Sequence, residues 1–227
     1  GLTAAHELVE RGFAVEVYER DERVGGKARS MGKPGSAAPG NHKLPGEHGF
    51  RFFPGFYRHI PDTMQRIPYA GGGTVLDNLV RTERAAYAQK DRDLYSFPTN
   101  HPSNIEEWAA MLYALVHFGD LGLDPGEGTF FAEKLLKFAT SCDARIDGEY
   151  EKERWWDFVD ADSRSKQYQK CLAEGMTRSL VAMKAKEAST RTIGRILLQI
   201  ILDLTRSSGT MDRVLNGDRK STRLNSS

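Results

Sequence analysis

The stretch GLTAAHELVERGFAVEVYERDERVGGKARS, from Gly1 to Ser30, decides the fold class. Apolar and small residues recur in it at helical spacing: Leu2, Ala5, Leu8 and Val9. Gly12 follows where a glycine commonly ends a helix. Residues 13–19 (FAVEVYE) alternate apolar and polar side chains, which predicts a β-strand that ends at Glu19. Helix, glycine turn, strand and terminal acid together indicate the second half of a βαβ nucleotide-binding unit.

A dinucleotide site of this kind needs three glycines before its first helix and a ribose-binding acid about 20 residues later. Gly1 fits the third glycine, Ala5 is small enough for the helix to approach a sheet, and Glu19 fits the acid. The first strand and two glycines would then precede Gly1, so we expect a truncated fragment that retains its nucleotide poorly. From these residues alone, an unrelated helix and strand are an equal alternative.

Two adjacent glycines and a cation follow the predicted strand: Gly25, Gly26 and Lys27. With this spacing from Glu19, residues 1–30 resemble the superfamily of flavin-dependent amine oxidases and carotenoid desaturases. The resemblance implies a Rossmann-like FAD-binding fold in which the glycines let the main chain pass close to the cofactor. It implies that Lys27 lies near the FAD phosphates or the flavin edge and Arg20 near the adenosine end. A solvated loop is the alternative for Arg20.

A second stretch, EHGFRFFPGFY at residues 47–57, resembles the segment after the cofactor loop of phytoene desaturases and hydroxysqualene dehydroxylases. The likeness implies that Gly49, Phe50 and Arg51 bind FAD. Neighbouring aromatic residues would form an apolar wall suited to a hydrocarbon: Phe50, Phe52, Phe53 and Phe56. Packing in an aromatic core is the alternative for each Phe. His48 receives no catalytic role, and the catalytic residues stay unassigned.

The remaining chain is expected to be mostly helical. Patterns predict helices at residues 56–67, 105–116, 129–140, 168–186 and 190–206, and a hairpin of residues 84–91 and 93–99. Ser103 is a candidate cap for the second of these helices. The last helix is apolar on most faces and is expected to be buried. Trp155 and Trp156 are expected to pack in a core, with a substrate tunnel as the alternative.

These elements predict an α/β protein with a helical substrate or cap domain. We expect a partial FAD-binding domain at residues 1–100, without its first strand, and the helical domain at residues 101–217. Residues 218–227 (DRKSTRLNSS) have no periodicity and look like a translated sequencing adapter. We therefore expect this tail to be non-native.

Composition argues against several classes of protein, including nucleic-acid-binding proteins and proteins with a membrane-spanning helix. The 227 residues are 39% hydrophobic and 28% charged with a net charge of +1, which argues against binding nucleic acid through phosphate neutralisation. No apolar run approaches the roughly 20 residues of a membrane-spanning helix. Cys142 and Cys171 lack the spacing of metal ligands, and no metal site is expected. They fit a reducing, cytoplasmic location, with peripheral membrane association for lipid access left open.

The resemblance implies an FAD-dependent oxidoreductase. Because the second stretch is rich in aromatic residues, our first hypothesis is desaturation or dehydroxylation of a small apolar isoprenoid-type substrate. A flavin amine oxidase is the second hypothesis. The third is a non-catalytic relative, since GDP-dissociation inhibitors share this fold and bind prenylated proteins without flavin. Glu19 and the glycine pair favour flavin binding over this third option. The oligomeric state and electron acceptor stay unassigned.

Overall fold

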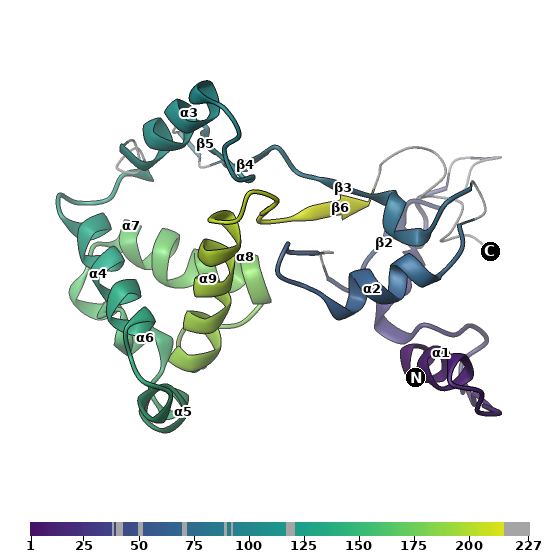
Figure 1. Cartoon of the computed structure of the whole chain (residues 1–227). Helices are drawn as coiled ribbons and strands as arrows, with labels where there is room; N and C mark the ends of the chain where they lie inside the picture. The colour runs from purple at the N-terminus through teal and green to yellow at the C-terminus, as the bar shows by residue number, and fades with distance from the viewer. Residues whose placement is uncertain are drawn as a thin grey trace. The chain divides into compact units, whose positions relative to one another are not determined.

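The computed structural model describes residues 1–37, 39, 43–49, 52–69, 72–88, 90–91, 93–116 and 121–215 (Figure 1). Helices and small two-stranded sheets make it a mixed protein, in agreement with the α/β class. No helix within these ranges is long and apolar enough to cross a membrane. The tail predicted to be non-native, at 218–227, lies outside the described residues.

The chain forms two compact units. Unit 1 comprises Gly1–Arg51, Arg58–Val80 and Val214–Ser227, and unit 2 comprises Phe52–Tyr57 and Arg81–Arg213. The units do not follow the expected boundary after residue 100, because the hairpin before that residue belongs to unit 2. Their assignment to FAD-binding and substrate domains stays a prediction.

Unit 1 begins with the predicted helix. Helix α1 spans Leu2–Glu10 and ends at Arg11, and the predicted terminating glycine is confirmed. Gly12 has a φ of 85°, and its N–H donates to the Val9 carbonyl at 2.9 Å. A glycine takes this left-handed conformation without the steric cost that a side chain would add.

The strand predicted at residues 13–19 is not formed. Among the described residues, the only backbone hydrogen bond of this segment joins the Phe13 N–H to the Leu8 carbonyl. Phe13, Val17 and Tyr18 are exposed. A strand exists only when a neighbour satisfies its backbone groups, and alternation of side chains cannot supply that neighbour. The parallel sheet of a Rossmann fold therefore stays a prediction.

The rest of unit 1 consists of short elements. Strand β1 (Met31–Gly32) pairs antiparallel with β2 (Pro45–Gly46), and Met31 lies opposite Gly46. Helix α2 spans His59–Arg66, which is shorter than the predicted 56–67. A 3₁₀ turn at Val75–Asn78 begins with a reciprocal cap between Thr74 and Asp77. Strand β3 (Leu79–Arg81) pairs with β6 (Arg213–Leu215), and both strands run across the unit boundaries.

Unit 2 contains the predicted hairpin. Strand β4 (Arg84–Tyr87) pairs antiparallel with β5 (Tyr95–Pro98), and Asp91 in the connection has a left-handed φ of 61°. Helix α3 (Ile105–Val116) is confirmed, but Ser103 is not its cap. The Asn104 side chain accepts from the Glu107 N–H at 2.9 Å, and Ser103 donates to the Glu107 carboxylate. The Asn104 side chain thus binds a backbone N–H of the first turn, which is what a helix cap does, whereas Ser103 binds the Glu107 side chain. The predicted cap was therefore one residue early.

The described part of unit 2 also contains the α-helices α4 (Glu127–Ala139), α5 (Asp143–Lys152), α6 (Trp155–Phe158), α7 (Lys166–Tyr168), α8 (Gly175–Val181) and α9 (Thr190–Leu204). The sequence reading missed α5 and α6. They surround an apolar core that includes Phe138, Trp155, Trp156 and Ile193. Packing of the two Trp residues, rather than tunnel lining, is therefore confirmed. In the described residues, every buried hydrophobic side chain other than proline belongs to this unit, between Leu121 and Ile200.

Two predictions about these helices need correction. The helix expected at 168–186 contains a π-helical turn at Gln169–Glu174 and ends at Ala182, which has a φ of 52°. It ends there because residues beyond it bind the core: the N–H groups of Trp155 and Trp156 donate to the carbonyls of Ala188 and Ala185. Helix α9 is not buried on most faces. It buries Ile193, Leu197 and Ile200 but exposes Ile201 and Leu202.

Candidate functional site

The glycine pair forms a sharp turn in unit 1. Gly25 and Gly26 have φ values of 111° and 54°, and a short 3₁₀ helix follows at Gly26–Ala28. The Ala28 N–H donates to the Gly25 carbonyl at 3.1 Å. Both φ values lie in the region that glycine tolerates and side chains rarely adopt. A Cβ on Gly26 would meet no atom within 4 Å, so the main chain there borders open space.

The charged residues before this turn are exposed. The Glu19 carboxylate accepts a hydrogen bond from the Asp21 N–H at 3.0 Å. Arg20 is 93% exposed and lies 3.6 Å from the Asp21 carboxylate. Lys27 is also exposed. These side chains are therefore accessible to a ligand, and their contacts with one another are few.

An open hollow of about 540 Å³ lies beside the turn. Its lining is Arg20, Asp21, Glu22, Arg23, Arg29, Ser30, Met31 and Gly32. The Arg29 guanidinium also donates to the Arg23 carbonyl, which fixes the loop across six residues. Three arginines at one hollow supply cations that suit phosphate groups, and two carboxylates, those of Asp21 and Glu22, share the lining.

Within unit 1, the structure brings the end of the first predicted stretch to the start of the second. Ser30, which is buried, donates to the Glu47 carboxylate, and the β1–β2 pair joins the segments on either side. Gly49 follows directly, and a Cβ there would meet no atom within 4 Å. Gly1 precedes α1, and its carbonyl accepts from the Ala5 N–H. Two predicted FAD-binding residues, Phe50 and Arg51, lie outside the described residues.

The aromatic segment Phe52–Tyr57 belongs to unit 2, where backbone hydrogen bonds fix it. The Phe53 N–H donates to Asp212 Oδ1 at 3.0 Å, and the Arg213 N–H donates to the Phe53 carbonyl at 3.1 Å. The Gly55 N–H donates to the Thr210 carbonyl at 3.0 Å. Burial raises the pKa of the Asp212 carboxyl, and the backbone N–H groups of Phe53 and Arg213 oppose this rise.

A glycine is required at position 55 because other atoms come close to its Cα. A Cβ there would overlap the carboxylate of Asp203 and the Thr210 carbonyl oxygen. Asp203 is buried and accepts from the Thr210 N–H at 3.1 Å. The sequence reading missed Asp203, Thr210 and Asp212, because nothing in the local pattern relates them to a segment about 150 residues earlier; Phe53 and Asp212 are 159 residues apart.

These features fit the nucleotide portion of FAD. Adjacent left-handed glycines beside open space permit a ligand to approach the main chain, and the first N–H groups of a helical turn have no partner within it. The arginines of the hollow would face the pyrophosphate, while the exposed Glu19 carboxylate would accept from hydroxyl groups.

Comparison with known families agrees with this fit. Residues 1–176 match the family described as flavin containing amine oxidoreductase. The chain therefore belongs to this family, and it is a flavin-dependent oxidoreductase with FAD as its cofactor. Searches of the curated proteins and of the solved structures gave no match.

Proposed function

We propose that unit 1 binds the adenosine and diphosphate of FAD through the residues predicted from the sequence. Glu19 would accept hydrogen bonds from the ribose, and Arg20 would contact the adenosine end. Gly25, Gly26 and Lys27 would face the diphosphate together with the start of α1. The observation that supports this placement is the pair of left-handed glycines beside the arginine-lined hollow.

We propose further that the substrate is an apolar isoprenoid-type molecule that undergoes desaturation or dehydroxylation. One observation carries this choice: Phe52, Phe53 and Phe56 are only partly buried, although hydrogen bonds fix the backbone of their segment. Rigid aromatic side chains that keep accessible surface suit an apolar ligand. FAD supplies the hydride acceptor when bound, and the protein residues bind, orient and exclude water.

A flavin amine oxidase is the second candidate, and the description of the matched family favours it. An amine substrate would need a polar or aromatic recognition site for its ammonium group. Tyr57 offers an aromatic face for that purpose, since it is 41% exposed and meets Phe56 edge to face at 5.2 Å.

To test both candidates, the full-length protein is purified and its flavin absorbance is recorded. It is then incubated, without air and in air, with phytoene, hydroxysqualene and a panel of amines. We expect a yellow protein in which the isoprenoids, and no amine, reduce the flavin. Reduction by amines alone, with peroxide formed in air, would favour the second candidate. A colourless protein that cannot be reconstituted with FAD would instead support a non-catalytic relative.

The proposed location is the cytoplasm, with peripheral membrane contact for access to a lipid substrate. Cell fractionation tests it, because a protein found only in a secreted or integral membrane fraction would contradict it.

A further inference from the structure

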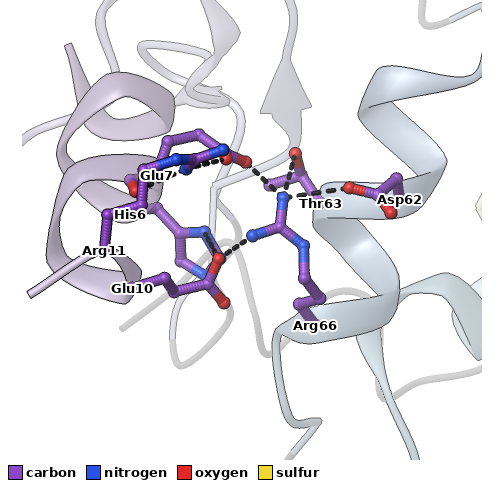
Figure 2. A network of polar contacts seen from close by, with 7 residues as sticks. All are labelled: His6, Glu7, Glu10, Arg11, Asp62, Thr63 and Arg66. Carbon is purple, nitrogen blue, oxygen red and sulfur yellow. Dashed lines mark hydrogen bonds and ion pairs between the residues drawn. The ribbon is translucent and has the colours of Figure 1, made fainter.

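A network of charged side chains joins α1 to α2 within unit 1 (Figure 2). The Arg66 guanidinium on α2 lies between two carboxylates of α1, and it pairs with both Glu7 and Glu10. It also contacts Asp62 on its own helix at 3.0 Å. Arg11 donates to Glu7 at 2.6 Å from the other side. One guanidinium thus bridges two successive turns of α1.

Among the described residues, this bridge is the side-chain ion pairing that links α1 to another helix. The helix buries none of its side chains. In the ranges that the structure describes, the remaining side-chain bonds of α1 lie within the helix: Arg11 to Glu7, and His6 to Glu10 at 3.6 Å. A helix without a buried apolar face depends on such polar contacts for its orientation.

The same cluster resembles a cation site, since ligand atoms of His6, Glu7 and Glu10 lie within 4.8 Å of one another. The arrangement favours arginine over a metal ion. Arg66 already pairs with both carboxylates, and its positive charge would repel a divalent cation placed between them. The planar guanidinium, with donors in a fixed fork, suits two carboxylates at once.

We propose that Arg66 is a positioning residue of the FAD site. It fixes α1 at Glu7 and Glu10 and thereby sets the place of the first turn of that helix, which the proposed function puts against the FAD diphosphate. A helix rises 1.5 Å per residue, so Glu7 lies about 9 Å along the axis from Gly1. Over that distance the helix is stiff, and an anchor at Glu7 and Glu10 limits the tilt at Gly1.

The test titrates FAD and ADP separately into the apo form of the full-length protein. For Arg66→Met, which keeps an unbranched apolar stem and removes the charged head, we expect the Kd for FAD to rise on the order of tenfold, as is typical of coupling between two sites. ADP, which has the diphosphate without the flavin, should lose affinity by the same factor. Arg66→Lys should recover part of the loss, because a single ammonium cannot reproduce the fork.

Arg191 provides a matched control in unit 2. It is 36% exposed, against 30% for Arg66, and it likewise bridges two carboxylates, those of Asp147 at 2.9 Å and Glu151 at 3.1 Å. Arg191→Met should leave both Kd values unchanged. All three Trp residues also lie in unit 2, so tryptophan-detected melting reports its folding and should be the same for wild type and Arg66→Met. Unit 1 is checked separately by hydrogen exchange: peptides that cover residues 72–80 should exchange equally in both proteins, so that unfolding of unit 1 cannot imitate the expected result.

The inference rests on the proposed FAD site, and Glu19→Ala separates the two. If Glu19→Ala raises the Kd for FAD and Arg66→Met does not, the site stands and the role of Arg66 is overturned. If neither substitution changes the Kd, the proposed site itself is wrong. An equal loss in Arg191→Met would also overturn the role of Arg66. So would a tighter Kd for FAD in micromolar Zn²⁺ that EDTA reverses, because it would make the cluster a metal site.

Discussion

Helices α1 and α9 carry similar surface ion pairs, but only α9 packs side chains into a buried apolar core. In unit 2, Arg191 and Arg195 of α9 pair with Asp147 of α5 outside a core that contains Ile193 and Leu197. In unit 1, Arg66 pairs with α1, which buries no side chain. Exposed ion pairs contribute little to stability where an apolar core already fixes the helices, so the proposed role of Arg66 depends on the lack of a buried side chain in α1. Unit 2 is therefore stabilised by its own packing, whereas the described residues of unit 1 contribute no side chain to the buried hydrophobic core.

The largest expected effect is on the free energy of unfolding, and it compares a buried Phe of unit 2 with an exposed Phe of unit 1. Phe138→Ala should lower the free energy of unfolding of the 227-residue chain by about 3–5 kcal/mol, because Phe138 is 1% exposed and stacks on Tyr150. Phe13→Ala, at a position that is 60% exposed, should change it by less than about 0.5 kcal/mol. Urea unfolding followed by tryptophan fluorescence and circular dichroism measures both. Equal losses for the two variants would remove the distinction between the units.

A smaller effect is expected at the glycines of the aromatic stretch. Gly55→Ala should cost about 1–3 kcal/mol, because its Cβ would overlap the Asp203 carboxylate. Gly49→Ala should leave unfolding within about 0.5 kcal/mol of wild type, since space around Gly49 is open. The same denaturant titration compares them. A stable Gly55→Ala protein would show that the Phe52–Tyr57 segment is not held as described.

Local patterns predicted the elements whose signals are local. Helix α1, Gly12 at its end, the hairpin of β4 and β5 and the start of α9 at Thr190 all follow from short-range spacing. The glycine pair at Gly25 and Gly26 was predicted from a family resemblance, and its positive φ values agree with the need for glycine. The site residues themselves stay predictions, because no ligand contact tests them.

The features that the sequence did not predict depend on contacts between residues far apart in the chain. Residues 13–19 alternate like a strand, yet pairing requires a neighbour that their own sequence does not specify. Asp203 and Asp212 reach Gly55 and Phe53 across some 150 residues, and Arg66 reaches Glu7 across 59. Charged residues on exposed helices usually indicate a solvated face, so no local signal could have identified these contacts.

The smallest expected effect is on the titration of the Glu7 carboxyl at acid pH. Hydrogen bonds from Arg66 and Arg11 lower the pKa of Glu7 from 4.5 to about 2. The ionised cluster thus favours the folded state fully above about pH 4.5, and this contribution is lost as the pH falls through about 2. In Arg66→Met, the midpoint for Glu7 should move back toward 4.5, while Arg11 keeps it somewhat lower. Carboxyl ¹³C NMR titration measures it, and an unchanged midpoint would contradict the pairing.

We propose that FAD binds to unit 1 at the Glu19–Lys27 turn, while unit 2 folds around its own core. Hydrogen–deuterium exchange of the full-length protein, with and without saturating FAD, tests this directly. We expect FAD to slow exchange most in peptides that cover residues 19–30, and to leave the core peptides of residues 131–172 nearly unchanged. Unchanged exchange in residues 19–30 at full FAD occupancy would contradict the account.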